Sequence, residues 1–313
     1  MELKQLRTFV AVVEQGSVSK AAHHLHTAQP ALSRQIADLE AELGLMLFDR
    51  VGRRLLLTGE GERLLSECRS LLRQARFLGE QAQTLRGGDS GLLKIAAAPV
   101  QIESALATVL PEYARRYPGV EVKVIESIGA NTISLLQRGE VHVGITLLDV
   151  VRPHDKYLQT VSLPPHELLA ACNPAVRLSK GTAADIECVA SHPLLLLDAA
   201  FAVRKKFDSI CRVANLKPNI LIECRAPHTL LALAEAGLGI AIVPSAAGIS
   251  RYAVRTIRIT YRDKPVLDPL VIVWERRRVL PRYAGAFCEL LAAHMRATKH
   301  ASARVRPLRT KGI

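Results

Sequence analysis

A short segment near the N-terminus combines residue types that hydrogen-bond to the edges of nucleic-acid bases. Gln29, Ser33 and Arg34 follow one another closely, and Pro30 stands between them. At about 3.6 residues per turn, Pro30, Ser33, Arg34 and Ala37 share the outer face of one helix, with Gln29 at its flank. This face is small and singly basic, and both Gln and Arg can offer two hydrogen bonds to a base. The spacing therefore predicts a helix that enters a DNA groove.

Apolar residues around this segment predict the helices that must position it. Their expected buried faces are Leu3, Leu6, Val10 and Val13 in the first helix, Val18, Ala21, Ala22 and Leu25 in the second, and Ala28, Leu32, Ile36, Leu39 and Leu43 in the third. Ser17 and Thr27 are expected to cap the second and third helices. A hairpin with Arg53 and Arg54 at its tip follows, and a basic tip suits the DNA backbone. The alternative is the solvated surface of a small helical bundle, but the caps, turn and hairpin together favour a DNA-binding unit.

A heptad pattern follows the hairpin. Thr58 can cap a long helix whose apolar positions alternate at spacings of four and three: Leu64, Cys68, Leu71, Ala75, Leu78, Ala82 and Leu85. Such a stripe predicts pairing with a second copy of the chain, with Leu64, Leu71, Ala75, Leu78 and Leu85 as the dimerisation residues. The alternative is an ordinary amphipathic helix that packs on the next domain. Glycines at 87, 88 and 91 then interrupt the helix and predict a hinge.

Residues 1–58 resemble the winged helix-turn-helix domain of the LysR-type transcriptional regulators. The matching pieces keep the order and spacing of that family, and they are Ala21-Ala22, Gln29 to Ile36, Leu39-Glu40, Glu42-Leu43-Gly44, Leu47 to Arg50 and Leu57-Thr58. The resemblance implies that Gln29, Pro30, Ser33 and Arg34 face the groove of promoter DNA. It places Arg53 and Arg54 at phosphate or in the minor groove. It also implies a homodimer or tetramer and, as a further partner, RNA polymerase.

Beyond Gly91 the sequence alternates between apolar strands and helical stretches. The predicted strands are 92–97, 120–125, 141–145, 167–171, 193–197, 219–223, 239–243 and 270–274, with helices over about 101–116 and 131–138. This alternation predicts parallel sheets with helices on both faces. Ligands of such folds lie outside the carboxyl ends of the strands, near helix N-termini. The second part of the chain is therefore expected to bind a small molecule.

The second part resembles the LysR effector-binding domain, which is similar in fold to periplasmic solute-binding proteins. The matching pieces are Gly91 to Ile95, Leu110-Pro111, Tyr117 to Val120, Gly139-Glu140 and Ala236 to Pro244, and His142 departs from the family's usual Asp. The implied division is a DNA-binding domain (1–58), a linker helix and hinge (59–90), an effector domain (91–298) and a basic, solvated tail (299–313). Two Rossmann-like subdomains would make up the effector domain, one from residues 91–163 and 267–298 and the other from 164–266.

The same resemblance implies a cleft between the two subdomains, formed by strand ends and helix starts. Its expected effector-binding residues are Ala98, Pro99, Val100, Gln101, Ala130, Asn131, Leu147, Ala199, Ala200, Phe201, His228 and Thr229. This set is poor in charge, which favours an apolar or aromatic effector. A carboxylate on that effector would be held by backbone N–H groups, Gln101 or Thr229.

Charge and length fit a two-domain regulator. The chain has 313 residues and a net charge of +13, yet residues 1–90 hold 12 Lys or Arg against 11 Asp or Glu. Residues 296–313 hold six basic side chains and no acid, so the tail could add non-specific attraction to nucleic acid. The N-terminus shows no signal-peptide pattern, and no apolar run is long enough to span a bilayer. We therefore expect a cytoplasmic protein that does not bind membranes.

No residue set predicts catalysis, a metal or a cofactor. The six cysteines form no CxxC pair, the ten histidines are scattered, and Gly237-Leu238-Gly239 is an incomplete dinucleotide fingerprint. Cysteines of a reducing cytosol are expected to be core thiols, and a redox sensor built on Cys211 and Cys224 is the minority alternative. The sequence thus favours a regulator that is not an enzyme. The alternative function is a small-molecule-binding protein or enzyme with an appended DNA-binding head.

Overall fold

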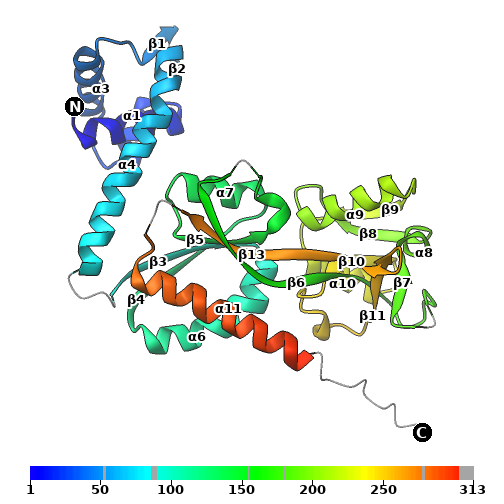
Figure 1. Cartoon of the computed structure of the whole chain (residues 1–313). Coiled ribbons are helices and arrows are strands. Elements are labelled where there is room, and N and C mark those ends of the chain that lie inside the picture. The colour runs from blue at the N-terminus through cyan, green and yellow to red at the C-terminus, as the bar shows by residue number, and fades with distance from the viewer. Residues whose placement is uncertain (52–53, 86–89, 154, 180, 277–278, 303–313) are drawn as a thin grey trace. The chain divides into compact units, whose positions relative to one another are not determined.

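The computed structural model divides into two compact units, Met1–Arg86 and Gly87–Ile313 (Figure 1). It describes the whole chain except residues 52–53, 86–89, 154, 180, 277–278 and 303–313. Within the described residues, no helix is long and apolar enough to cross a membrane.

The N-terminal unit is a helical cluster with a small hairpin. Its elements are α1 (Leu3–Gln15), α2 (Val18–His24), α3 (Gln29–Leu43), β1 (Phe48–Val51), β2 (Arg54–Leu57) and α4 (Gly59–Leu85). The buried faces predicted for α2 and α3 are largely confirmed, since Ala21, Ala22, Leu32, Ile36 and Leu39 are all buried. The prediction is wrong for Ala28, which is exposed at the N-cap of α3. The hairpin pairs β1 with β2 in antiparallel register. These elements are those of a winged helix-turn-helix.

The face predicted for α1 is partly wrong. Leu3 is 45% exposed, whereas Leu6, Phe9 and Val12 are buried. The ring of Phe9 makes an edge-to-face contact with Phe48 of β1, with the ring centroids 5.5 Å apart. This aromatic contact turns α1 so that Phe9 enters the core, a choice that the apolar spacing alone leaves open.

One of the predicted helix caps is also wrong. The N-cap of α3 is Ala28, and Thr27 instead donates its hydroxyl to the carbonyl of Leu25 at 3.2 Å. Ser17 occupies the N-cap position of α2 but makes no side-chain capping bond. Thr58 is confirmed as a cap of α4, because its Oγ1 accepts the N–H of Gly61 at 2.9 Å. The same hydroxyl donates to the Met46 carbonyl at 2.7 Å, so it ties the start of α4 to the segment before β1.

The apolar stripe of α4 serves two purposes along its length. Cys68 is buried in the core of the N-terminal unit, and Leu64 is half-buried against that core. Leu71 and Leu78 are 41% and 68% exposed. The side chain of Leu85, also predicted to be in the stripe, lies outside the described residues. The part of the stripe that lacks cover within the described chain therefore begins at Leu71.

The C-terminal unit contains the remaining elements. Its helices are α5 (Pro99–Gln101), α6 (Ala107–Arg116), α7 (Ala130–Gln137), α8 (Ile186–Ala190), α9 (Ala202–Val213), α10 (Pro227–Glu235) and α11 (Arg282–Ser302), with a π-helical turn η1 (Ile102–Leu106) and two 3-10 turns η2 (Leu148–Val150) and η3 (Ile249–Arg251). Its strands are β3 (Ser90–Ala97), β4 (Gly119–Glu126), β5 (Val143–Leu147), β6 (Leu158–Cys172), β7 (Ala183–Asp185), β8 (Pro193–Leu197), β9 (Asn219–Cys224), β10 (Ile240–Pro244), β11 (Arg255–Tyr261), β12 (Lys264–Pro265) and β13 (Leu267–Glu275).

The strands form two lobes joined by two shared strands. The order β4-β3-β5-β13-β6-β10-β8-β9 places β3, β4 and β5 in a first lobe and β8, β9 and β10 in a second. Within each lobe these three strands are parallel, as predicted. The prediction of purely parallel sheets is wrong for β6 and β13, which pair antiparallel with each other and with their neighbours. Both strands run from one lobe to the other (Figure 1).

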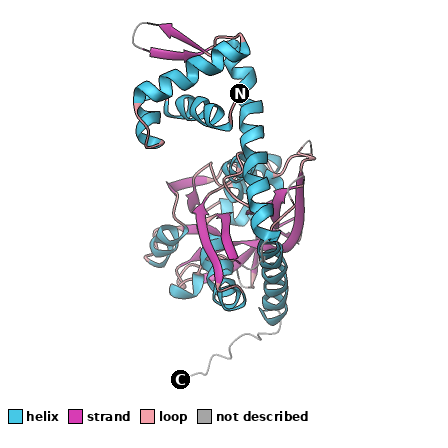
Figure 2. Ribbon diagram, turned by 90° about the vertical axis from the view of Figure 1, so that its left-hand side faces the viewer, coloured by secondary structure: helices cyan, strands magenta, loops and turns pink. Residues whose placement is uncertain are grey.

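Helices pack beside the strands of the C-terminal unit (Figure 2), and each lobe has its own buried apolar core. In the first lobe, Tyr113 of α6 is fully buried and donates its hydroxyl to the Tyr283 carbonyl at the start of α11, at 2.9 Å. In the second lobe, Phe207 of α9 and Leu230 of α10 pack on the buried strands β8 and β10. Helix α11 continues to Ser302, so the first residues of the expected tail are helical, and residues 303–313 lie outside the described part.

Candidate functional site: a reading helix and a cleft

Helix α3 presents the predicted reading face to solvent. Gln29, Pro30 and Arg34 are exposed, and Ser33 is half-buried. Gln29 is held at one side, because Ser19 of α2 donates its hydroxyl to Gln29 Oε1 at 2.9 Å. The structure thus brings these four residues together on one surface, which we call the reading face. Arg53 lies outside the described residues, as does the side chain of Arg54.

Two buried-side contacts fix the orientation of α3. Thr8 of α1 is buried and donates its hydroxyl to Gln35 at 2.6 Å. Glu40 accepts the N–H groups of Leu47 and Phe48 at 2.8 and 3.1 Å, which ties the start of the hairpin to the helix. The sequence reasoning assigned no role to Glu40, although its place beside the buried Leu39 marked it as an acid at the edge of a core.

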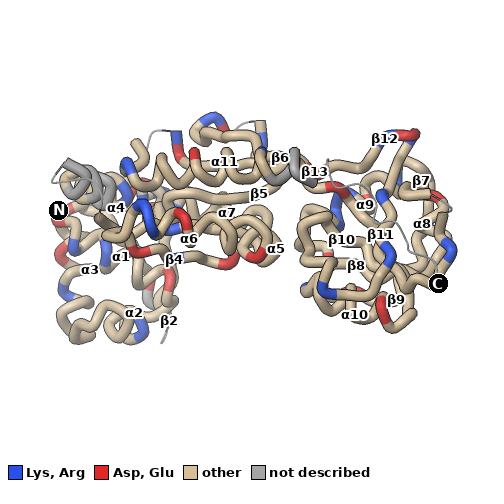
Figure 3. Tube along the Cα trace, turned by 90° about the horizontal axis from the view of Figure 1, so that it is seen from below, with Lys and Arg blue, Asp and Glu red and all other residues tan. Residues whose placement is uncertain are grey.

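Net charge does not single out the N-terminal unit as the DNA-binding one. Figure 3 shows Lys and Arg residues intermixed with Asp and Glu residues along its trace. Phosphate attraction scales with the local number of cations, whereas base readout depends on individual side chains. The exposed Arg34 on a small-residue face is therefore the stronger indication.

The C-terminal unit contains a cleft between its two lobes. It opens at the carboxyl ends of β3, β5, β8 and β10, where α5, α7, α9 and α10 begin. Six predicted residues line it: Ala98, Pro99, Val100, Gln101, Leu147 and Phe201. The lining residues that the sequence reasoning missed are Ser127, Ile128, Gly129, Ile145, Thr146, Val150, His166, Leu197, Ala202, Val203, Pro227 and Pro244.

The other six predicted effector residues lie outside the cleft lining. These are Ala130, Asn131, Ala199, Ala200, His228 and Thr229. They lie only one or two residues along the chain from residues that do line the cleft, such as Gly129, Ala202 and Pro227. His228 is used elsewhere, since its Nε2 lies 2.6 Å from Glu103 and its Nδ1 3.2 Å from the hydroxyl of Tyr252.

Gln101 is the most informative lining residue. Its side chain is only 7% exposed, and its Oε1 is buried without a hydrogen-bond partner among the described residues. The backbone fixes its position, because its N–H donates to the Ala98 carbonyl at 2.9 Å and the π-helical turn η1 begins directly after it. An unpaired buried carbonyl oxygen is costly, and such atoms are concentrated at functional sites.

His166 adds a second polar group from the shared strand β6. Its side chain is 6% exposed, and burial lowers its pKa to about 4, so the imidazole is neutral near pH 7. Asp268 is its cross-strand partner on β13 and is also buried. Burial raises the pKa of Asp268 to about 6; Lys206 acts against this shift and Asp149 adds to it. Its Oδ2 has no partner among the described residues.

Among the described residues, three contacts between basic and acidic side chains join the lobes near the cleft. Lys206 of α9 lies 3.0 Å from Asp149 of η2. Glu103 of η1 lies 2.6 Å from His228 Nε2 of α10 and 3.9 Å from Arg251 of η3. Each contact connects an element of the second lobe with one of the first. These contacts therefore hold the two lobes at the distance seen in this structure. A wider or narrower cleft would break them.

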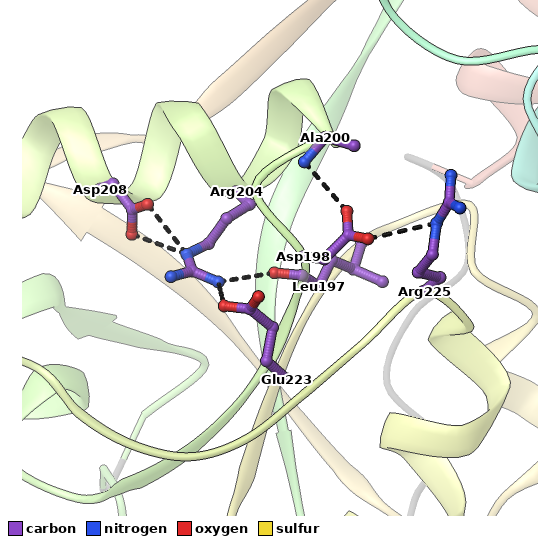
Figure 4. Close-up of polar contacts among 7 residues, drawn as sticks. All are labelled: Leu197, Asp198, Ala200, Arg204, Asp208, Glu223 and Arg225. Atoms are coloured by element: carbon purple, nitrogen blue, oxygen red, sulfur yellow. Dashed lines mark hydrogen bonds and ion pairs between the residues drawn. The ribbon is translucent and has the colours of Figure 1, made fainter.

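Basic residues near the cleft are engaged by acids. Arg204 follows the lining residue Val203, and its guanidinium binds Asp208, Glu223 and the Leu197 carbonyl (Figure 4). Arg225 lies 3.2 Å from Asp198, whose other oxygen accepts the N–H of Ala200. These contacts hold the loop between β8 and α9, and they leave the guanidinium of Arg204 committed to structure.

Neither the cysteines nor metal-binding groups suggest further chemistry. All six cysteines are free thiols, Cys211 is buried, and burial raises the pKa of its thiol to about 11. A raised pKa disfavours the reactive thiolate, which weakens the redox alternative. Among the described residues, no group of three or more His, Cys, Asp or Glu side chains could hold a metal ion.

Models of two protein domains match the chain. Residues 3–62 match the bacterial regulatory helix-turn-helix protein of the lysR family. Residues 86–296 match the LysR substrate binding domain. Together these matches cover both units of the structure, including the reading face and the cleft.

Similar proteins extend over nearly the full length. IlvR of Caulobacter vibrioides, an HTH-type transcriptional regulator, is 30% identical over 295 residues, which are 91% of this chain and 96% of IlvR. AlsR of Bacillus subtilis is 31% identical over 79% of this chain and 82% of its own. Full-length OxyR of Pseudomonas aeruginosa has the same fold, with a TM-score of 0.72, 21% identity and coverage of 93% and 94%. CbnR in complex with its target DNA gives a TM-score of 0.63 at 25% identity, over 93% of this chain and 99% of CbnR.

Proposed function

The chain belongs to the LysR family of bacterial transcriptional regulators, and from this premise we propose how its two sites work together. A regulator of this family binds DNA through its helix-turn-helix domain and an effector through its substrate-binding domain. The proposal concerns which residues of this chain read DNA, what occupies the cleft, and how one site acts on the other.

The reading face of α3 contacts base edges in the major groove of promoter DNA. Gln29, Pro30, Ser33 and Arg34 carry this role, and the support is their joint placement on the outer surface of one helix. Arg34 supplies a bidentate donor for a base, while the small Ser33 and Pro30 let the backbone approach. Arg53 and Arg54 at the hairpin tip contact phosphate or the minor groove, as the family resemblance implies.

The cleft of the C-terminal unit binds the effector. The observation that carries this is Gln101, a buried residue of the cleft lining whose amide oxygen has no partner among the described residues. The largely aliphatic lining supports an apolar or aromatic molecule. Thr229, which was expected to hold a carboxylate, does not line the cleft. The polar groups that do line the cleft therefore decide whether it favours a charged or an uncharged effector.

Two copies of the chain pair through α4, with Leu71, Ala75 and Leu78 in the seam, and dimers pair again into tetramers. The exposure of Leu71 and Leu78 supports this. A two-fold dimer matches a palindromic operator. Effector binding bends β6 and β13 and so changes the opening of the cleft. The polar contacts between the lobes then break or form again. As a result, the distance between the two reading faces of the dimer changes, and with it the access of RNA polymerase to the promoter.

The test uses the full chain and its own operators, located by genome-wide mapping of bound sites. Genes next to those sites suggest effectors, whose action is then measured by footprinting. Ala202→Trp fills the cleft at the start of α9 and should abolish the response to effector while leaving operator binding intact. Ala200→Trp adds the same ring two residues earlier, at an exposed position outside the lining, and should respond normally. A full response of Ala202→Trp to effector would contradict cleft binding.

A further inference from the structure

The polar side chains that line the cleft are uncharged near pH 7. None of the residues that line it is Lys, Arg, Asp or Glu. The buried polar side chains of its lining are Ser127, Thr146, His166 and Gln101. Ser127 Oγ already accepts hydrogen bonds from Asn131 and Thr132, whereas Gln101 Oε1 has no partner among the described residues. The amide of Gln101 and a neutral imidazole can each donate and accept a hydrogen bond. A carboxylate, by contrast, only accepts.

Arg204 and Lys206, two basic residues of α9 next to the cleft lining, are already paired with acids. The guanidinium of Arg204 is bound by two carboxylates, and Lys206 is paired with Asp149 at 3.0 Å. Burial keeps the pKa of His166 at about 4, so the imidazole carries no charge near pH 7. Transferring a carboxylate from water into such a lining is costly unless it finds a paired charge.

The helix N-termini at the cleft offer few free backbone N–H groups that could bind a carboxylate in place of a cation. Helices α5 and α10 begin with Pro99 and Pro227, which have no N–H. In α7 the N–H groups of Asn131 and Thr132 already donate to the carbonyls of Ile128 and Gly129, at 3.3 and 3.1 Å. The aligned N–H groups that normally hold a carboxylate are therefore reduced at three of the four helix starts.

We propose that the effector of this regulator is an uncharged molecule, with an apolar body and a hydroxyl or carboxamide group that donates a hydrogen bond to Gln101 Oε1. This inference rests on the proposed cleft function and replaces the carboxylate expected from the sequence. The group that donates to Gln101 relieves an oxygen that is otherwise buried without a partner. The imidazole of His166 offers a second neutral contact in the same cleft.

Four probes built on one aromatic ring test the polar group alone. Benzyl alcohol, benzamide, benzoate and toluene are titrated into the full chain, and the methyl signals of Ile128, Leu147 and Val203 report occupancy of the cleft. We expect benzyl alcohol and benzamide to bind about tenfold more tightly than benzoate. We also expect both to bind several-fold more tightly than toluene, since toluene cannot donate to Gln101.

Gln101→Leu identifies the acceptor. It should weaken benzyl alcohol about tenfold and leave toluene unchanged or slightly tighter, because it removes a hydrogen bond and adds apolar surface. Gln159→Leu makes the same change at an exposed position of β6 outside the lining and should alter neither affinity.

The outcomes separate this inference from the proposed function. If benzoate binds most tightly and shifts the cleft methyl signals, the cleft is the ligand site but the uncharged effector is wrong. If the preference for the alcohol survives Gln101→Leu, Gln101 is not its acceptor and the inference is overturned. If none of the four probes shifts those methyl signals, both the inference and the cleft function fail. The order of affinities in the unaltered chain decides the first and third outcomes even if Gln101→Leu does not fold.

Discussion

The reading face and the cleft differ in how far apart along the chain their parts lie. Gln29, Ser33 and Arg34 belong to a single helix, and the helical repeat alone brings them to one surface. The cleft takes residues from Ala98 to Pro244, on elements of both lobes and on a strand that runs between them. The first site is local and exposed, whereas the second exists only when two lobes are folded and joined.

This difference teaches how substitutions should act at the two sites. A side chain of the reading face can be truncated with little change in stability, because it contacts solvent in the free protein. A polar side chain of the cleft or of its connecting strands is buried. Changing its charge or its hydrogen bonds therefore also changes the free energy of unfolding. The three predictions below test this contrast, from the largest expected effect to the smallest.

The largest effect is expected between copies of the chain. Replacing the exposed Leu71 and Leu78 together with Asp places like charges from both copies in the proposed seam. The dimer should dissociate, and operator affinity should fall by about 10²–10⁴-fold because two reading faces no longer bind at once. Sedimentation and operator titration measure both changes. The cleft should still bind its ligand, since its lining lies wholly in the C-terminal unit.

A matched control introduces the same charges elsewhere on α4. Ser66→Asp with Gln74→Asp changes two exposed positions outside the stripe and should leave the oligomer and its affinity intact. An unchanged oligomer in the Leu71 and Leu78 variant would show that this part of α4 is not the seam.

A smaller effect is expected at the reading face. Arg34→Ala should cost about 1–3 kcal/mol of operator binding and relax base preference at one position of each half-site, with an unchanged thermal midpoint of unfolding. Binding selection from a randomised operator measures the preference. Arg63→Ala removes an exposed arginine of α4 and serves as the control. Retained affinity and preference in Arg34→Ala would place the reading face elsewhere.

The smallest effect concerns a buried carboxyl between the lobes and should depend on pH. Burial raises the pKa of Asp268 to about 6 from an ordinary 3.8, so the folded chain binds this proton more tightly than the unfolded chain. Its contribution to stability therefore falls as pH rises from about 4 to about 6 and is constant above that window. Asp268→Asn should raise the free energy of unfolding by about 1–2 kcal/mol at pH 7.5 and by nothing near pH 4.

Chemical denaturation at several pH values measures this difference. Glu121→Gln removes an exposed carboxylate of β4 and should show no such pH dependence. A loss of stability in Asp268→Asn at pH 7.5 would mean that the ionised carboxylate is favoured by its surroundings, and the contrast drawn between the two sites would then fail for this residue.

The N-terminal unit was largely predictable because its signals are local. The spacing of Leu32, Ile36 and Leu39 fixes the buried face of α3, and so fixes Arg34 on the outer one. The prediction was wrong where two neighbouring apolar residues could each have been the buried one. Phe9 rather than Val10 entered the core, because only the fold brings Phe48 within contact of it.

Only the part of the cleft that directly follows β3 was predicted completely. Ala98 to Gln101 follow a strand directly, so the rule for ligands at strand ends sufficed to place them. His166 was missed because its strand was expected to begin at residue 167, whereas β6 begins at Leu158 and passes between the lobes. His228 was expected in the cleft from its place at a helix start, but its Nε2 instead makes a hydrogen-bond contact with Glu103 of the opposite lobe.

The sequence by itself determined the order of the domains, the reading helix and the strands of each lobe, because helical and strand periodicities act over a few residues. Tertiary structure alone decided that β6 and β13 join the lobes antiparallel, which residues face the cleft, and that Gln101 Oε1 stays without a partner there. These features depend on residues more than 60 positions apart, such as Gln101 and His166. Whether a buried polar group finds a partner is decided by what the other lobe places beside it, and no local pattern encodes that.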